Sequence, residues 1–109
     1  DAAFNLGRMG MLLAGLDDRR RLLPEATEDR LHQEARSPLF PQAPGLLAAL
    51  VEAGAGAACW SGAGPSLLAV CAADRAEQVR AAGEKLLADA GVSGEAVRLE
   101  ADLEGLVRE

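Results

Sequence analysis

The sequence has no tyrosine, two phenylalanines and one tryptophan, so it lacks the aromatic side chains on which nucleic-acid-binding surfaces stack bases. Positive charge is also scarce: the formal net charge is −6, and the only basic cluster is Arg19 to Arg21. Because neutralising phosphates supplies most of the affinity for nucleic acid, we expect no nucleic-acid partner. No apolar run approaches the ~20 residues of a membrane span and no signal peptide opens the chain, so we expect a cytoplasmic protein without a membrane partner.

Metal-binding and redox side chains are equally few. His32 is the single histidine, which gives little support to a metal site or a Ser–His pair and favours a surface or capping role. Cys59 and Cys71 are the two cysteines, and each lies in an apolar stretch. Free cysteine packs as a small hydrophobic residue, so the pattern predicts two buried thiols and neither a disulfide nor a metal pair.

The chain has 109 residues, half of them apolar and 26% charged, which is typical of one soluble globular domain. Because the first residue is Asp1 and the chain begins inside an expected helix, we expect further sequence upstream.

Apolar periodicity predicts helices and strands in mixed order. Prolines 38, 41 and 44 predict an extended connector, because proline disfavours helix at the residue before it. Asp74 and Glu77 have the spacing of a helix capping box. The expected helices are 2–16, 22–33, 44–53 and 74–91, and the expected strands are 56–60, 67–71 and 97–101. The order predicts an α+β fold in which helices cover one face of an antiparallel sheet. Two or three strands leave this sheet incomplete, so we expect another strand from upstream sequence or from a partner.

Two features of the sequence each allow two interpretations. Asp1, Asn5 and Arg8 share one face of the first helix, which is either a solvated stripe or a binding surface. The stretch SGAGPSLLAV, residues 61–70, places two glycines and a proline before a strand. It is either a hairpin turn or a loop whose backbone approaches an anionic ligand closely.

Three stretches, DAAFNLGR, EDRLHQEARSPLFP and SGAGPSLLAV, together resemble the C-terminal half of the homoserine kinase branch of the GHMP family of small-molecule kinases. SGAGP is similar to the third GHMP motif. The resemblance implies that residues 1–109 are a ferredoxin-like C-terminal GHMP domain whose N-terminal ATP-binding domain lies outside the chain. It implies transfer of the γ-phosphoryl group of MgATP to the hydroxyl of L-homoserine, on the way to threonine. ATP and Mg²⁺ would be bound mainly by the N-terminal domain, so we expect the chain alone to be inactive. The resemblance leaves a homodimer open.

The resemblance also suggests substrate-binding residues. An amino-acid substrate needs its carboxylate held, and arginine suits this task because its planar fork can bind a carboxylate bidentately. Arg36 is the first candidate, and Arg8 with Asn5 is the second. Gly62 and Gly64 would let the loop backbone approach the substrate, and a side chain at either glycine would enter the space that substrate and phosphate share.

The chain departs from the usual family pattern at Glu34-Ala35 and at Gln42, which affects the expected local shape around Arg36. Two alternatives remain: another GHMP kinase of the mevalonate type, and a non-catalytic ferredoxin-like domain that binds a small molecule or regulates a partner.

Overall fold

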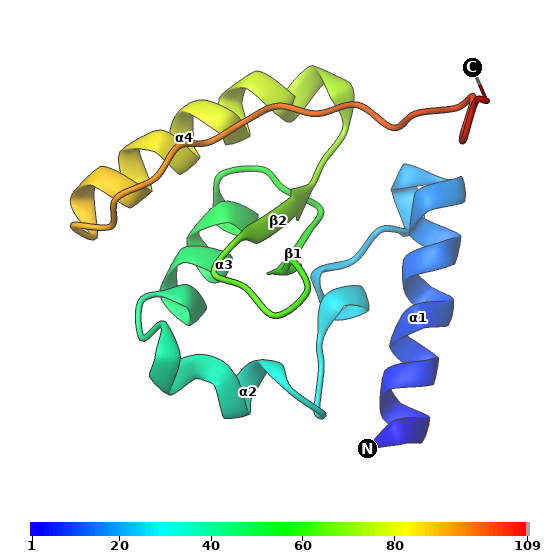
Figure 1. Cartoon of the computed structure of the whole chain (residues 1–109). Helices are drawn as coiled ribbons and strands as arrows, with labels where there is room; N and C mark the ends of the chain where they lie inside the picture. Colours follow the sequence, from blue (N-terminus) through cyan, green and yellow to red (C-terminus); the bar gives the residue numbers. More distant parts are fainter. Residues whose placement is uncertain (109) are drawn as a thin grey trace.

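The structure is a computed structural model that describes residues 1–108 (Figure 1). It confirms the α+β class, with an antiparallel hairpin and helices around it. Its α-helices are α1 (Ala2–Asp17), α2 (Gln33–Arg36), α3 (Ala43–Glu52) and α4 (Ala76–Asp89), and its strands are β1 (Ala57–Trp60) and β2 (Leu67–Val70). Short 3₁₀ helices are η1 (Arg19–Arg21), η2 (Pro24–Thr27), η3 (Ser37–Leu39) and η4 (Ala73–Arg75).

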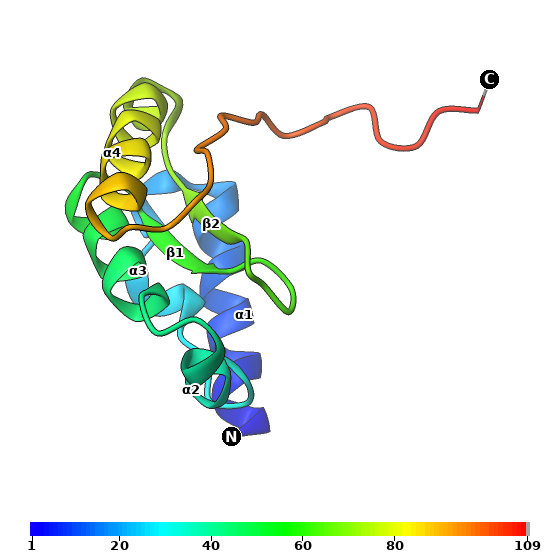
Figure 2. The same ribbon diagram turned by 60° about the vertical axis from the view of Figure 1, so that its left-hand side comes forward.

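The hairpin is the centre of the fold, and its two strands lie within one residue of the predicted ranges 56–60 and 67–71. Trp60 pairs with Leu67 and Cys59 pairs with Leu68, so residues 61–66 form the loop. Both cysteines are free thiols, and each is half-buried rather than fully buried as the sequence predicted. α3 contacts both strands and α4 contacts α3, whereas α1 reaches the sheet through η2, which contacts β1 (Figures 1 and 2). The small core consists of Ala26, Ala43, Leu46, Ala55, Ala57, Trp60 and Val79.

The first helix, α1, exposes several large apolar side chains and directs polar side chains toward the rest of the fold, which is the reverse of most surface helices. Leu6, Met9, Leu13 and Leu16 are each more than half exposed, at 74, 52, 61 and 59%. Its polar residues Asn5 and Arg8 instead contact the segment that follows η2. The polar face of this helix is therefore not the solvated stripe that one interpretation of the sequence predicted.

None of the helices in residues 1–108 is both long and apolar enough to cross a membrane.

The helix predicted over 22–33 is wrong. Pro24 begins the 3₁₀ turn η2, which ends at Thr27. The Asp29 carboxylate then accepts the N–H groups of Leu31, His32 and Gln33. Side-chain acceptors of this kind compete with the helical ladder, so a second helix, α2, begins only at Gln33.

The extended connector predicted across the prolines is also wrong. α2 ends at Arg36, and the 3₁₀ helix η3 follows directly. Pro38 lies in the first turn of η3 and Pro44 lies in the first turn of α3. Proline is tolerated there because the first N–H groups of a helix have no helical acceptor.

The capping box predicted at the start of α4 is not formed. Asp74 lies in η4, and no side-chain hydrogen bond caps the start of α4 in the described part of the chain. Glu77 instead pairs with Arg80, whose Nη2 lies 2.6 Å from Glu77 Oε1. The helix ends at Asp89, two residues before Gly91, which has a positive φ of 67°.

The strand predicted over 97–101 is wrong as well, because the sheet in residues 1–108 contains β1 and β2 alone. Val97 and Leu99 are 63% and 81% exposed, and the segment runs beside α4 (Figure 1). The Ala96 N–H donates to Glu84 of α4 at 2.8 Å. Alternating side chains make a strand only when the backbone has a neighbouring strand to pair with, and here its neighbour is a helix.

Candidate functional site

The structure brings two of the predicted site elements together. Arg36 ends α2, and its Nη1 donates to the carbonyl of Ala63 at 3.2 Å. Ala63 lies between Gly62 and Gly64 in the loop that joins β1 to β2. The arginine proposed to hold a carboxylate and the glycine loop are therefore adjacent, although they are far apart in the sequence.

The two glycines of this loop serve different purposes. Gly62 has a φ of +57°, which favours glycine, and a Cβ atom there would meet nothing within 4 Å. Gly64 has a φ of +79°, and a Cβ atom there would lie 2.6 Å from the ring of Trp60. A side chain at Gly64 would therefore clash with Trp60 within the domain, and its entry into the substrate space stays a prediction.

Arg8 and Asn5 lie at a second place, where α1 meets the turn after η2. Arg8 Nη2 lies 2.9 Å from Glu28 Oε2, and the guanidinium carbon lies 4.4 Å from the centre of the Phe4 ring. The Nε atom of Arg8 is buried and has no hydrogen-bond partner within residues 1–108. Because this Nε is enclosed by the protein, an anion from outside could reach the Arg8 guanidinium only through its terminal nitrogens, and the side chain is 26% exposed.

Asp29 connects these elements, and sequence reasoning missed it because the residue fell inside an expected helix. Its carboxylate accepts the Asn5 Nδ2 at 2.7 Å and the N–H groups of His32 and Gln33, each at 2.7 Å. Burial alone would raise the pKa of this carboxyl, but these hydrogen bonds outweigh burial and hold the pKa well below its usual range. An aspartate just before a short polar segment is a known signal for such a cap, and it could have indicated the turn.

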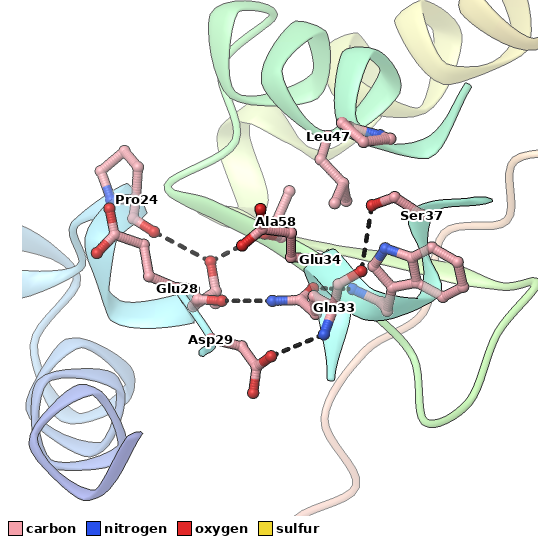
Figure 3. Close-up of a pocket in the computed structure, with 11 residues that line it drawn as sticks. Pro24, Glu28, Asp29, Gln33, Glu34, Ser37, Leu47 and Ala58 are labelled. Carbon is pink, nitrogen blue, oxygen red and sulfur yellow. Dashed lines mark hydrogen bonds between the residues drawn. The ribbon is translucent and has the colours of Figure 1, made fainter. Parts of the chain in front are cut away.

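A pocket of about 340 Å³ lies next to this turn (Figure 3). Gln33 lies at its centre, where its backbone N–H bonds to Asp29 and its carbonyl accepts the Ser37 hydroxyl at 3.2 Å (Figure 3). The predicted residues Arg36, Arg8, Asn5, Gly62 and Gly64 are not in its lining. The lining consists of Pro24, Thr27, Glu28, Asp29, Gln33, Glu34, Ser37, Pro44, Leu47, Ala58 and Trp60.

A larger cavity of about 740 Å³ lies between β2, α4 and the segment 92–99. Apolar side chains such as Leu67, Val79 and Leu87 line much of it. It also contains none of the predicted site residues. Across residues 1–108, no group of three or more His, Cys, Asp and Glu side chains is arranged to hold a metal ion.

Comparison with known proteins identifies similar chains. A family model described as "GHMP kinases C terminal" matches residues 7–89. The homoserine kinase of Desulfitobacterium hafniense is 39% identical over 106 residues, which cover 96% of this chain and 36% of that protein. The homoserine kinase of Streptomyces coelicolor is 47% identical over 81 residues, covering 74% of this chain and 26% of that protein. That of a Synechococcus species is 40% identical over 100 residues, covering 91% and 32%.

This chain therefore spans about a third of the length of the curated relatives it matches. No solved structure matches it.

Proposed function

Because the chain belongs to the GHMP kinase family, we propose that it is the C-terminal part of a homoserine kinase. The full-length protein would transfer the γ-phosphoryl group of ATP to the hydroxyl of L-homoserine. The product, O-phospho-L-homoserine, would serve threonine biosynthesis in the cytoplasm. The family match and the homoserine kinases that resemble most of the chain support this assignment over a non-catalytic binding domain.

The observation that carries the proposal is the placement of Arg36 against the glycine loop. Phosphoryl transfer depends chiefly on positioning, so an amino-acid substrate must be held by its charged groups while its hydroxyl is aimed at the γ-phosphate. Arg36 is half-buried, and within residues 1–108 its guanidinium makes one hydrogen bond, to the uncharged carbonyl of Ala63. Exchange of that carbonyl for the substrate carboxylate would add the attraction of a second, opposite charge at the loop.

Arg8 is the second residue that we assign to the substrate carboxylate. Its guanidinium is partly exposed where it lies between Phe4 and Glu28, which leaves room for a further anionic partner. Asn5 stays a candidate for substrate contact, but both polar atoms of its amide already make hydrogen bonds within the fold.

Residues 1–108, which the structure describes, do not fit a site for ATP or magnesium. The described residues offer no acidic metal cluster, and the glycine loop joins two strands rather than leading into a helix whose N-terminus could face a phosphate. We therefore propose that ATP and Mg²⁺ are bound by an N-terminal domain of the full-length protein, and that residues 1–109 are its C-terminal domain.

The two edges of the sheet support this division into domains. At the outer edge of β1, the Ala58 carbonyl accepts the Thr27 hydroxyl at 2.9 Å and the Trp60 N–H donates to Gln33 at 2.8 Å. The register partners of these two residues, Ala69 and Leu67, therefore direct their polar groups to the opposite edge, beside the larger cavity. The sheet can thus be extended at β2, and we propose that chain outside residues 1–109 supplies the neighbouring strand.

The test is made on the full-length protein that contains this chain. Purified enzyme is supplied with MgATP and either L-homoserine or mevalonate, and phosphorylated products are identified by mass spectrometry. We expect phosphorylation of homoserine with a far higher kcat/KM. Preferred phosphorylation of mevalonate would support the alternative GHMP kinase, and failure to phosphorylate either would overturn the assignment. The same assay on the 109-residue chain alone should show no turnover.

A further inference from the structure

The helix that carries Arg36 depends on Asp29. α2 consists of four residues, and a helix of one turn is not stable by itself. Its first N–H groups have no acceptor within the helix. Asp29 Oδ2 accepts the N–H groups of His32 and Gln33, each at 2.7 Å, and therefore fixes where the turn begins.

The direction of Arg36 follows from the placement of this turn. The Arg36 N–H donates to the His32 carbonyl at 3.0 Å, which ties the arginine backbone to a residue that Asp29 holds. Rotation of α2 would carry the guanidinium away from Ala63. Asp29 therefore acts on the glycine-loop end of the site without touching it.

Asn5 anchors Asp29 from α1. Asn5 Nδ2 donates to Asp29 Oδ1 at 2.7 Å, and Asn5 Oδ1 accepts the Arg30 N–H at 3.0 Å. If the Asn5 amide turned over, both bonds would be lost, because its oxygen would then face the Asp29 carboxylate and its NH₂ group would face the Arg30 N–H. The side chain of Asp29 is only 9% exposed, so little water is available to replace a lost partner.

We propose that Asp29 is a positioning residue that aims Arg36 at the substrate, and that Asn5 holds it in place. This proposal rests on the proposed function, since it takes Arg36 as the residue that binds the homoserine carboxylate. It gives Asn5 a role through Asp29 in place of a direct contact with the substrate.

An exchange of the two side chains tests the pair. In Asp29→Asn, two amide N–H groups face each other, because the Arg30 N–H keeps Asn5 in its orientation. In Asn5→Asp, two carboxylates face each other. The double variant restores a complementary pair: Asp at position 5 can accept from both Arg30 and the new amide, and Asn at position 29 can still accept from Gln33. Asp74→Asn, an exposed change in η4, is the control.

In the full-length enzyme, Asp29→Asn should lower kcat/KM for homoserine about tenfold through a higher KM, with the KM for ATP unchanged. Asn5→Asp should do the same, and the double variant should return to within about threefold of wild type. A purely structural role would lower the unfolding temperature without this selective change in KM. An unchanged homoserine KM in both single variants, or a double variant as impaired as they are, would overturn the proposal.

A second measurement separates this proposal from the proposed function. Trp60 is the single tryptophan of the 109-residue chain and bonds directly to Gln33 of α2. If wild-type enzyme does not phosphorylate homoserine, the proposed function fails, and acrylamide quenching of Trp60 then decides whether Asp29 positions α2. Greater quenching in both single variants, reversed in the double variant, would support that role. Equal quenching in all four proteins would overturn it.

Discussion

Gln33 and Trp60 are joined across 27 residues of sequence, with Gln33 Oε1 accepting the backbone N–H of Trp60 at 2.8 Å. The other end of the same amide, Nε2, donates to the carbonyl of Thr27 at 3.0 Å. One side chain of α2 thus satisfies the outer edge of β1 and the end of η2. It links the helix that carries Arg36 to the strand that leads into the glycine loop.

Gln33→Leu should destabilise the fold, because it leaves the Trp60 N–H and the Thr27 carbonyl without partners. We expect the free energy of unfolding to fall by about 1–3 kcal/mol, measured by urea unfolding of the 109-residue chain. Gln78→Leu is the matched control, since it removes one exposed bond to the Ala53 carbonyl and should cost less. Equal losses of unfolding free energy in the two variants would show that the bonds of Gln33 to Trp60 and Thr27 stabilise the fold no more than an exposed bond does.

Arg36→Ala should weaken homoserine binding in the full-length enzyme. Loss of a hydrogen bond to a charged group costs about 1.5–3 kcal/mol, so kcat/KM for homoserine should fall about tenfold to a hundredfold. The KM for ATP should change little. Steady-state kinetics of Arg21→Ala, an exposed arginine in η1, provide the control. A homoserine KM equal to wild type would mean that Arg36 only supports the loop.

Arg8→Ala should also raise the KM for homoserine, and its effect should differ from that of removing its partner. Arg8→Ala removes the proposed anion-binding donor, whereas Glu28→Gln leaves the arginine in place and removes the competing carboxylate at 2.9 Å. We expect the first variant to lose affinity for homoserine and the second to retain it. Equal losses in the two variants would assign Arg8 a structural role.

The two loop glycines should respond differently to alanine. Gly62→Ala meets open space and costs only the strain of a positive φ, about 1–2 kcal/mol. Gly64→Ala adds a clash with the Trp60 ring, so its free energy of unfolding should fall further. Urea unfolding of both variants checks this order. Gly62→Ala is therefore the cleaner probe of the loop in catalysis, and a loss of homoserine kcat/KM beyond its stability cost would favour close substrate approach over a simple turn.

The Asp29 carboxyl should make stability fall at acid pH. Its pKa is lower in the folded chain than the usual value near 4, so its contribution is fully present above the unfolded pKa and is lost as the pH falls below about 4. The difference in unfolding free energy between wild type and Asp29→Asn should therefore shrink between pH 6 and pH 3. Glu77→Gln is the comparison, since the exposed Glu77–Arg80 pair should contribute little at any pH. If the difference in unfolding free energy between wild type and Asp29→Asn stayed constant from pH 6 to pH 3, it would contradict a lowered pKa for the Asp29 carboxyl.

Strong apolar periodicity and turn residues made several elements predictable. The first helix, the helix over 44–53 and the hairpin around SGAGP follow from local pattern, and the structure has them within a few residues. The helix over 22–33 failed because a single carboxylate, Asp29, took the N–H groups that the helix would have used. Pattern reasoning counts apolar spacing and does not register one polar side chain that competes with the backbone.

The residue types of the candidate site could likewise be named from the sequence, whereas their neighbours could not. The motifs pointed to Arg36, Arg8 and the glycines, but the contact of Arg36 with Ala63 and the capture of Asn5 by Asp29 join residues more than twenty positions apart. Contacts of that range depend on how elements pack, which local spacing does not determine.

The sequence by itself determined the family, the α+β class and the hairpin, because motif spacing, alternation and turn chemistry are local properties of the chain. The tertiary structure decided which backbone groups at the edges of the strands find hydrogen-bond partners. Thr27 and Gln33 close the outer edge of β1, while segment 97–101, with equally suitable alternation, remains unpaired beside α4. The physical reason is that a strand is completed by a neighbour's backbone hydrogen bonds, and only packing in three dimensions places that neighbour.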